Sequence, residues 1–259
     1  MFTLVDEIAL WRLNRELERW RRGGQRPKLW WRDDDARELT AALSRLIEMA
    51  DGRPLTLAIV PAGELKSLAG GLHGVRRLTI AQHGVDHINR RPPGKSPCEY
   101  DLATRAPQVC LAIKTARRAM TQAGLAPAAY VPPWNQVDDV LLEALPPAGF
   151  TVLSGGAERL ATTTLSQVGA QLDIMRWSRT PPRFRGWGRV LNTLRRRLKT
   201  HRRVAEPDLP IGLLTHHLAH DEEAWRFLAW FIAFADRNFQ WCSFEEAQPL
   251  CPPPTLWAG

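Results

Sequence analysis

Hydrophobic and polar positions along the chain follow two periods in turn. Short apolar runs typical of buried strands precede stretches in which apolar residues recur with helical spacing. The expected strands are residues 28–34, 54–62, 76–84, 128–135, 149–156, 171–177 and 210–217. The expected helices are residues 36–50, 63–70, 107–123, 137–145 and 221–237. Since strand–helix–strand units build parallel sheets, the pattern predicts an α/β fold, either a barrel or a doubly wound sheet.

The two ends of the chain add helices outside this alternation. Residues 1–24 place Leu4, Ile8 and Trp11 at helical spacing, and Asp6 and Glu7 interrupt what a secretory signal would need as an apolar run. The apolar stretch at 227–235 is too short to span a bilayer. We therefore expect a cytoplasmic protein with one domain over 1–259. Its parts would be an N-terminal helix (1–24), a barrel (28–220), and a C-terminal helix and tail (221–259).

Charge narrows the choice of partners without fixing one. The 259 residues carry a net charge of +8, which favours nucleic acid, a membrane surface or an acidic glycan. The densest basic segment, 183–203, contains Arg195, Arg196 and Arg197 and is a candidate contact for an anionic glycan or membrane. No nucleic-acid reading motif accompanies it, and a solvated basic helix face is the simpler interpretation. The four cysteines have no CxxC pair, which predicts free thiols.

Residues suited to chemistry gather where the expected strands end. They are Asp33, Asp34 and Asp35, His83 and His87, Pro133, Trp134 and Asn135, Asp173 and Trp177, and His216 and His217. In a βα barrel the carboxyl ends of the strands share one face, where active sites lie. The pattern therefore predicts that these residues converge.

Two histidines four positions apart, His83 and His87, would complete a three-ligand set with one carboxylate. Three ligands and an open position are typical of catalytic zinc, whose bound water becomes a nucleophile near neutral pH. A neighbouring carboxylate could accept the proton of that water. The competing interpretation is an Asp-rich N-cap before Ala36, worth about 1 kcal/mol, which explains one carboxylate but not three.

The remaining candidates would serve proton transfer and substrate contact. Side chains alternate along a strand, so we expect only one of His216 and His217 to act as a general acid. The backbone N–H of Trp134 could stabilise an oxyanion. Flat faces for a sugar ring or acyl group would come from Trp134, Trp177, Trp30 and Trp31.

Together these motifs resemble the polysaccharide deacetylases, carbohydrate esterase family 4, with the NodB-homology fold. The resemblance spans residues 28 to about 220 and implies an irregular (β/α)₇ barrel. It assigns Asp34 as base, Asp35, His83 and His87 as metal ligands, and His216, which ends the Leu213–His216 motif, as general acid. The residues implied for substrate binding are Pro133, Trp134, Asn135, Asp173, Trp177 and Leu214.

The chain departs from the family pattern at three positions. Val131 stands where the family usually has an arginine that orients the base, and Gly84 stands where a Ser or Thr follows the first histidine. Ala36 replaces a common glycine. We expect Arg32, Asp33 or Asn135 to share the orienting role.

The resemblance implies a metal-dependent deacetylase, a hydrolase of linear amides that are not peptide bonds, acting on an N-acylated sugar or polysaccharide. A divalent metal, with zinc expected, would be its cofactor. The alternatives are a catalytically impaired carbohydrate-binding protein of the same fold and a basic protein that binds an anionic surface.

Overall fold

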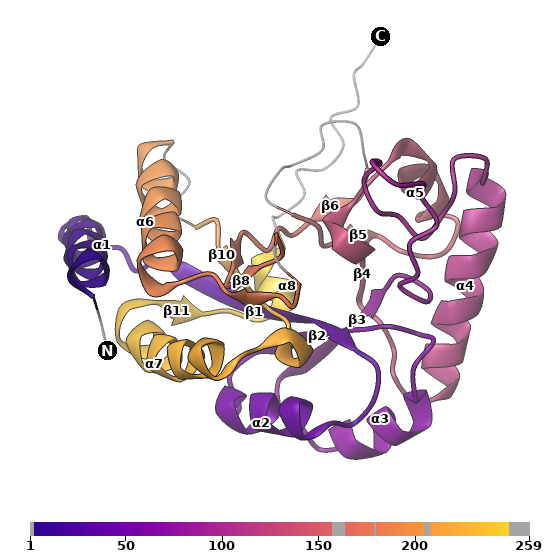
Figure 1. The fold of residues 1–259 in the computed structure, drawn as a ribbon, viewed down its shortest axis with the longest axis horizontal. Coiled ribbons are helices and arrows are strands. Elements are labelled where there is room, and N and C mark those ends of the chain that lie inside the picture. Colours follow the sequence, from indigo (N-terminus) through magenta and orange to yellow (C-terminus); the bar gives the residue numbers. More distant parts are fainter. Residues whose placement is uncertain (1–2, 157–163, 179, 205–207, 249–259) are drawn as a thin grey trace, which may run out of the picture.

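A curved parallel sheet forms the centre of the molecule in a computed structural model that describes residues 3–156, 164–178, 180–204 and 208–248 (Figure 1). Its strands lie in the order β6-β5-β4-β3-β2-β1-β10-β7, all parallel, and β11 pairs with the start of β1. The strands of the sheet are β1 (Lys28–Ala36), β2 (Leu55–Ile59), β3 (Leu78–His83), β4 (Ala129–Val131), β5 (Val152–Leu153), β6 (Ser166–Gln167), β7 (Leu172–Asp173), β10 (Ile211–Thr215) and β11 (Gln240–Trp241). The predicted irregular (β/α)₇ barrel is confirmed.

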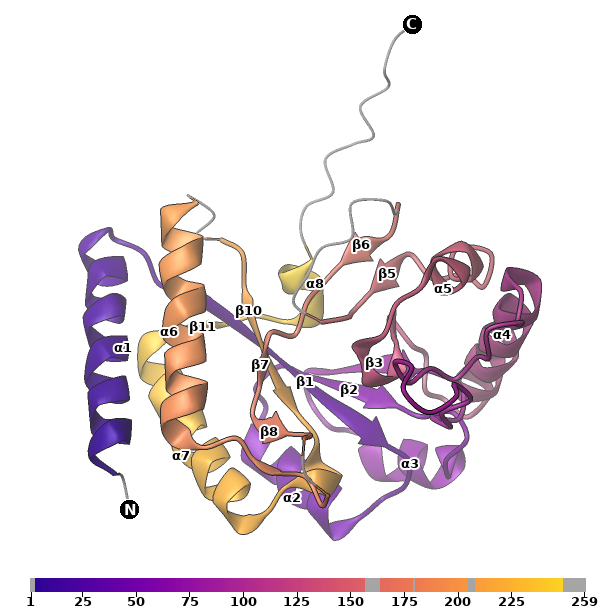
Figure 2. The same ribbon diagram turned by 45° about the horizontal axis from the view of Figure 1, so that its top comes forward.

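Helices cover the outer face of this sheet and one of its ends. They are α1 (Leu4–Arg22), α2 (Ala41–Ala50), α3 (Leu65–Leu72), α4 (Ala106–Gln122), α5 (Asp139–Ala144), α6 (Trp187–Arg203), α7 (Glu222–Asn238) and α8 (Phe244–Ala247), with short 3₁₀ turns η1 (Pro133–Asn135) and η2 (His217–Ala219). In Figure 2, α1 lies outside α6, at the end of the molecule opposite α4. Among the described residues no helix is long and apolar enough to cross a membrane.

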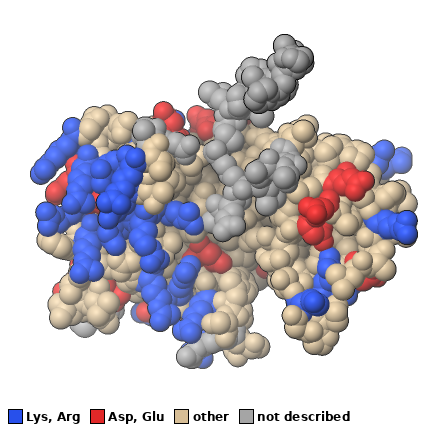
Figure 3. Space-filling model, turned by 90° about the horizontal axis from the view of Figure 1, so that it is seen from above, with Lys and Arg blue, Asp and Glu red and all other residues tan. Residues whose placement is uncertain are grey.

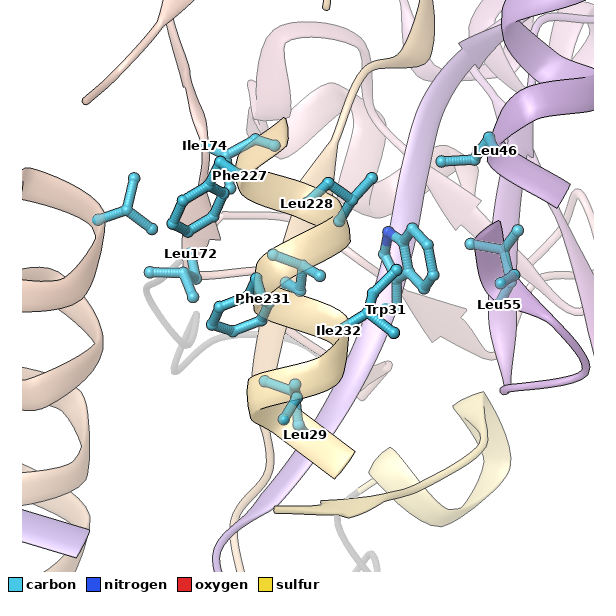
Figure 4. Close-up of a cluster of buried hydrophobic side chains, with 14 of the residues drawn as sticks. Leu29, Trp31, Leu46, Leu55, Leu172, Ile174, Phe227, Leu228, Phe231 and Ile232 are labelled. Atoms are coloured by element: carbon cyan, nitrogen blue, oxygen red, sulfur yellow. The ribbon is translucent and has the colours of Figure 1, made fainter. Parts of the chain in front are cut away.

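Alternation along β1 divides its side chains between two buried layers. Leu29 and Trp31 belong to one buried cluster with Leu228, Phe231 and Ile232 of α7 (Figure 4). The intervening Trp30 faces the barrel interior, with its ring centroid 5.9 Å from that of Phe244 on α8. Both tryptophans of β1 are about 1% exposed. Trp31 lies within the core beside α7, so the expectation that it offers a face to a substrate is wrong, whereas Trp30 lines a cavity of about 680 Å³.

The three aspartates belong to the strand and not to a helix cap. Strand β1 continues to Ala36, and the helix expected from residue 36 begins at Ala41 as α2. Its cap is Thr40, whose Oγ1 accepts the Leu43 N–H at 3.1 Å. The N-cap interpretation of the acid run is therefore wrong.

The strand expected at 171–177 is interrupted after Asp173. That carboxylate accepts the Met175 N–H at 2.8 Å, and the chain leaves the sheet as β8 (Met175–Arg176), which pairs antiparallel with β9 (Arg183–Phe184). The hairpin carries Trp177 to the mouth of the barrel. The tail expected at the C-terminus includes residues 249–259, which lie outside the described residues.

Candidate active site

A β-bulge at the end of β1 lets two adjacent aspartates reach the same cluster of histidines. Asp33 pairs with Leu57 of β2 but Ala36 pairs with Ile59, so three steps along β1 face two along its neighbour. Asp35 has a φ of 73°, which a non-glycine residue rarely adopts. As a result Asp34 and Asp35 both approach histidines, whereas a regular strand would point them to opposite faces.

Asp35, His83 and His87 form the one group among the described residues whose donor atoms could hold a metal ion, all within 4.8 Å of one another. Asp35 Oδ1 lies 3.1 Å from Nε2 of His83 and 3.2 Å from Nε2 of His87. Burial alone would raise the pKa of Asp35, but its bond to His83 and the surrounding imidazoles outweigh burial and lower it. Nδ1 of His83 lies 3.1 Å from the Val131 carbonyl, and a proton donated there would leave the Nε2 lone pair for a cation. The donor set therefore fits a metal such as zinc.

A buried glutamate shapes the loop that carries His87. Glu99 Oε1 accepts the backbone N–H groups of Val85 at 2.9 Å, Asp86 at 2.8 Å and His87. Burial raises the pKa of Glu99 even though these bonds favour its ionised form. The sequence analysis missed this residue because it lies in an irregular loop with no periodicity or motif to mark it.

The same loop leaves no room for a side chain at position 84. Gly84 has a φ of 63°, and a Cβ there would lie 2.4 Å from both Glu99 Oε1 and Pro133 Cγ. No side chain fits this space without displacing the glutamate or the η1 turn. The glycine and the buried glutamate therefore form one arrangement.

Arg32 holds Asp34 from within the same strand. Its Nε lies 2.9 Å from Asp34 Oδ1, and its Nη2 donates to Oδ2 at 3.0 Å. The guanidinium also donates to the Ser154 carbonyl and to Asn135 Oδ1, both at 2.8 Å, and its side chain is fully buried. Of the three residues expected to replace the arginine missing at Val131, Arg32 contacts Asp34 directly and Asn135 contacts Arg32.

Asp33 lies apart from this network. Its Oδ2 accepts from Thr215 Oγ1 at 2.6 Å and from the His217 N–H at 3.1 Å, and its Oδ1 pairs with His217 Nδ1. Both side chains of the Asp33–His217 pair are fully buried. Burial would raise the pKa of Asp33, but the paired imidazole outweighs it and lowers that pKa. The pair fixes the turn that follows β10.

His216, the neighbour of that pair, points toward the candidate base. Its Nε2 lies 3.9 Å from Asp34 Oδ2. Among the described residues its buried Nδ1 has no hydrogen-bond partner. The structure thus separates the two adjacent histidines, one paired with Asp33 and the other facing Asp34.

Two tryptophans stand beside the histidines. The Trp134 ring lies 4.4 Å from that of His87, and the Trp177 ring lies 4.5 Å from that of His216. Trp177 Nε1 donates to Asp173 Oδ2 at 2.8 Å, which fixes the indole, and burial raises the pKa of Asp173. Trp177 remains 47% exposed, so its face is open to a ligand.

The other predicted contacts include two buried residues. Pro133 is buried in η1, and Leu214 is buried in the barrel interior. Arg195 and Arg196 line a surface groove beside α1 instead. Arg197 lines a cavity of about 680 Å³ that also touches Asn135.

Comparison with known proteins supports the fold alone. No family model matches the sequence, and no curated protein matches it. Solved structures do match: the T48 deacetylase with substrate has a TM-score of 0.53 at 14% identity, covering 86% of this chain and 90% of that one. The family 4 carbohydrate esterase from Streptomyces lividans in complex with acetate gives 0.50 at 13%, covering 87% and 98%. A 4-alpha-glucanotransferase from Thermococcus litoralis gives 0.52 at 9%, covering 85% of this chain and 38% of that one.

This likeness establishes the barrel. The identities are low and the matches include a glucanotransferase, so the shared fold does not determine which reaction the site carries out.

Proposed function

We propose that the protein is a metal-dependent hydrolase that removes an acetyl or related acyl group from an N-acylated sugar or polysaccharide. The observation that carries the proposal is the convergence of a three-donor cluster with a carboxylate held by Arg32 and with the imidazole of His216, 3.9 Å from that carboxylate. Such a grouping at one strand-end face supports hydrolysis of an amide, because it offers candidates for the metal ligands, the base and the acid. The deacetylases among the structural matches are consistent with it.

Asp35, His83 and His87 would hold the ion, and zinc suits two imidazoles and a carboxylate. A bound zinc ion would supply a Lewis acid beside the acyl carbonyl.

The chain's own residues would move the protons. Asp34 would accept a proton from the attacking water, whose oxygen bonds to the acyl carbon. His216 would donate a proton from Nε2 to the leaving nitrogen as the C–N bond breaks, releasing an amine and a carboxylate. Arg32 would keep the Asp34 carboxylate oriented, and Trp134 and Trp177 would flank the sugar or acyl group.

The test compares metal content and acetate release from a panel of N-acetyl sugars and their oligomers. We expect about one zinc ion per chain, lost in His83→Ala and Asp35→Ala but retained in His73→Ala, an exposed histidine on another loop. Asp34→Asn and His216→Ala should keep the metal and lose turnover by roughly 10²–10⁴-fold, the usual size of general acid–base effects. Asp139→Asn, at an exposed position on α5, should behave like the parent.

A metal-binding protein without turnover is the second candidate, and Val131 is the observation that favours it. Retained zinc with no acyl release from any substrate, together with sugar binding that Asp34→Asn leaves unchanged, would establish that candidate. If Asp34→Asn kept full activity while Asp33→Asn lost it, the general base would be Asp33 instead of Asp34.

A further inference from the structure

Helix α1 presents an apolar stripe on the side that faces away from the protein. Ala9, Leu13, Leu17 and Trp20 are buried on the opposite side, within the core cluster that includes α6. The outward residues remain exposed: Leu4 by 72%, Val5 by 68%, Ile8 by 42% and Trp11 by 57%. Leu4, Ile8 and Trp11 are spaced by four and three positions, so they form one continuous stripe. A contiguous exposed patch of this kind marks an interaction site.

Arginines surround this stripe on both helices. Arg15 places its guanidinium 5.0 Å from the centre of the Trp11 ring. A groove between the helices is lined by Val5 and Arg12 of α1 together with Arg185, Arg189, Arg195 and Arg196. In Figure 3, Lys and Arg gather over the end of the molecule formed by α1 and α6.

A hydrogen bond joins α1 to the start of α6 at this surface. Asp6 accepts from the Gly188 N–H at 2.8 Å and from Thr3 of its own helix cap, so its charge is engaged in the scaffold. Glu7 and Glu18 of α1 are exposed, but the arginines of α1 and α6 outnumber them and leave an excess of positive charge at the surface.

We propose that this end of the molecule docks on an anionic lipid bilayer. The docking surface consists of the apolar stripe of α1 and the arginines around it on α1, on α6 and just before α6. These residues are Leu4, Val5, Ile8 and Trp11, and Arg12, Arg15, Arg185, Arg189 and Arg196. Apolar side chains and tryptophan enter the headgroup boundary while arginines contact lipid phosphates, as in interfacial amphipathic helices. A nucleic acid would use the arginines but would leave the aliphatic residues exposed. A second copy would bring the same positive surface against itself.

The docking surface adjoins the candidate active site through Arg185. Its backbone N–H donates to the Ile174 carbonyl at 2.8 Å, and its Nη1 contacts the Asp173 carbonyl at 3.4 Å. Asp173 in turn holds the indole of Trp177, so Arg185 links the docking surface to a residue of the candidate site. Bilayer binding itself does not rest on the proposed hydrolase activity.

Co-sedimentation of the full chain with vesicles tests the proposal. We expect binding to phosphatidylcholine mixed with phosphatidylglycerol, little binding to phosphatidylcholine alone, and a steep loss as salt rises. Arg189→Gln with Arg196→Gln should weaken binding by about tenfold or more, because each surface arginine contributes about 1 kcal/mol to attraction by anionic lipids. Ile8→Ser with Trp11→Ser should weaken it comparably. The matched control is Leu111→Ser with Lys114→Gln and Arg118→Gln, an exposed leucine and two exposed cations on α4.

Three results would overturn the proposal. The first is no sedimentation with anionic vesicles, and the second is equal loss in the α4 control. The third is a dimer or a DNA complex that forms with the parent and disappears with the Arg189 and Arg196 substitutions while vesicle binding persists. Circular dichroism of every variant establishes that lost binding is not lost folding.

Discussion

Residues in strained backbone conformations concentrate at the candidate site. Among the described residues six non-glycine positions have positive φ, and four of them are Asp35, His87, Trp134 and Asn135. Each such residue costs of order 1–3 kcal/mol and persists only where its surroundings hold it. The backbone of His87 is held by its hydrogen bond to Glu99 Oε1. Asn135 is held by the hydrogen bond that Arg32 donates to its Oδ1.

Replacing Gly84 by serine, the residue type that the family pattern favours, should damage this site. The new Cβ would collide with Glu99 and Pro133, and the backbone at φ 63° would be strained. We expect a loss of about 1–3 kcal/mol in unfolding free energy and weaker zinc binding. Gly74→Ser is the control, since its φ is 79° but no atom lies within 4 Å of its Cβ. Denaturant melts and zinc titrations of both variants measure the difference, and equal effects would contradict the clash.

Replacing Arg32 by lysine should separate orientation from charge. An ammonium cannot bind Asp34 in two places while also contacting Ser154 and Asn135. We expect kcat to fall by roughly tenfold or more while KM and zinc content stay near those of the parent. A rise in KM alone would show that Arg32 serves substrate binding instead.

Sequence reasoning located the site because strand ends converge in any βα barrel. It placed Asp34, Asp35, His83, His87 and His216 together, and the structure brings them together. It could not assign Asp33 to His217 or foresee Glu99, because those contacts depend on the turn that follows β10 and on an irregular loop, neither of which leaves a periodic trace.

At the scale of elements, a buried carboxylate ties α1 to α6. Glu16 is about 1% exposed, and its Oε1 and Oε2 lie 2.7 Å from Arg202 Nε of α6 and from Arg19 Nη1. Burial would raise the pKa of Glu16, but the two guanidinium groups outweigh it and lower that pKa below its ordinary value of 4.5. The ionised carboxylate is thus favoured by the folded state.

The stabilising effect of Glu16 should depend on pH in one direction. Its contribution is fully present above the ordinary pKa of 4.5 and is lost as the pH falls through the lower folded-state pKa. Glu16→Gln should cost about 1–3 kcal/mol near neutral pH, and its difference from the parent should shrink as the pH drops below 4.5. Glu18→Gln, at an exposed position on the same helix, should cost little at any pH. Denaturant unfolding across this range measures both, and a constant difference would contradict the assignment.

The elements themselves were predictable where the hydrophobic period was long. The expected strands and helices occur in the predicted order, but β6, β9 and α6 were not among them. Helix α2 begins five residues later than expected because β1 extends through its acid run to Ala36. Residues 171–177 were expected to form one strand but contain two, β7 and β8, because the Asp173 carboxylate accepts the Met175 N–H and redirects the chain.

At the scale of the whole molecule, a bound ion would fasten β1 to β3 across β2. Asp35 belongs to β1, and the two histidines end and follow β3. Zinc at 100 times its dissociation constant would stabilise the fold by about 2.7 kcal/mol. For a chain of this size we expect the Tm to rise by roughly 5–10 °C. Chelation should reverse the shift, His87→Ala should abolish it, and His73→Ala should retain it in calorimetry.

The pairing of β1 with β10 has a consequence for how the chain acquires its fold. Asp33 faces Thr215 in that register, so the first strand completes its hydrogen bonds only after β10, whose Thr215 lies 182 residues further along the chain, has been synthesised. Contacts between residues so distant in sequence form slowly, because the entropy cost of closing a long loop comes before the favourable energy of the contacts. Leu29 and Trp31 also remain without their packing partners on α7 until that helix has been synthesised. A nascent chain leaving the ribosome therefore exposes Leu29, Trp30 and Trp31 until these partners are made, and a chaperone that holds the segment around residues 28–36 would shorten the path to the native state.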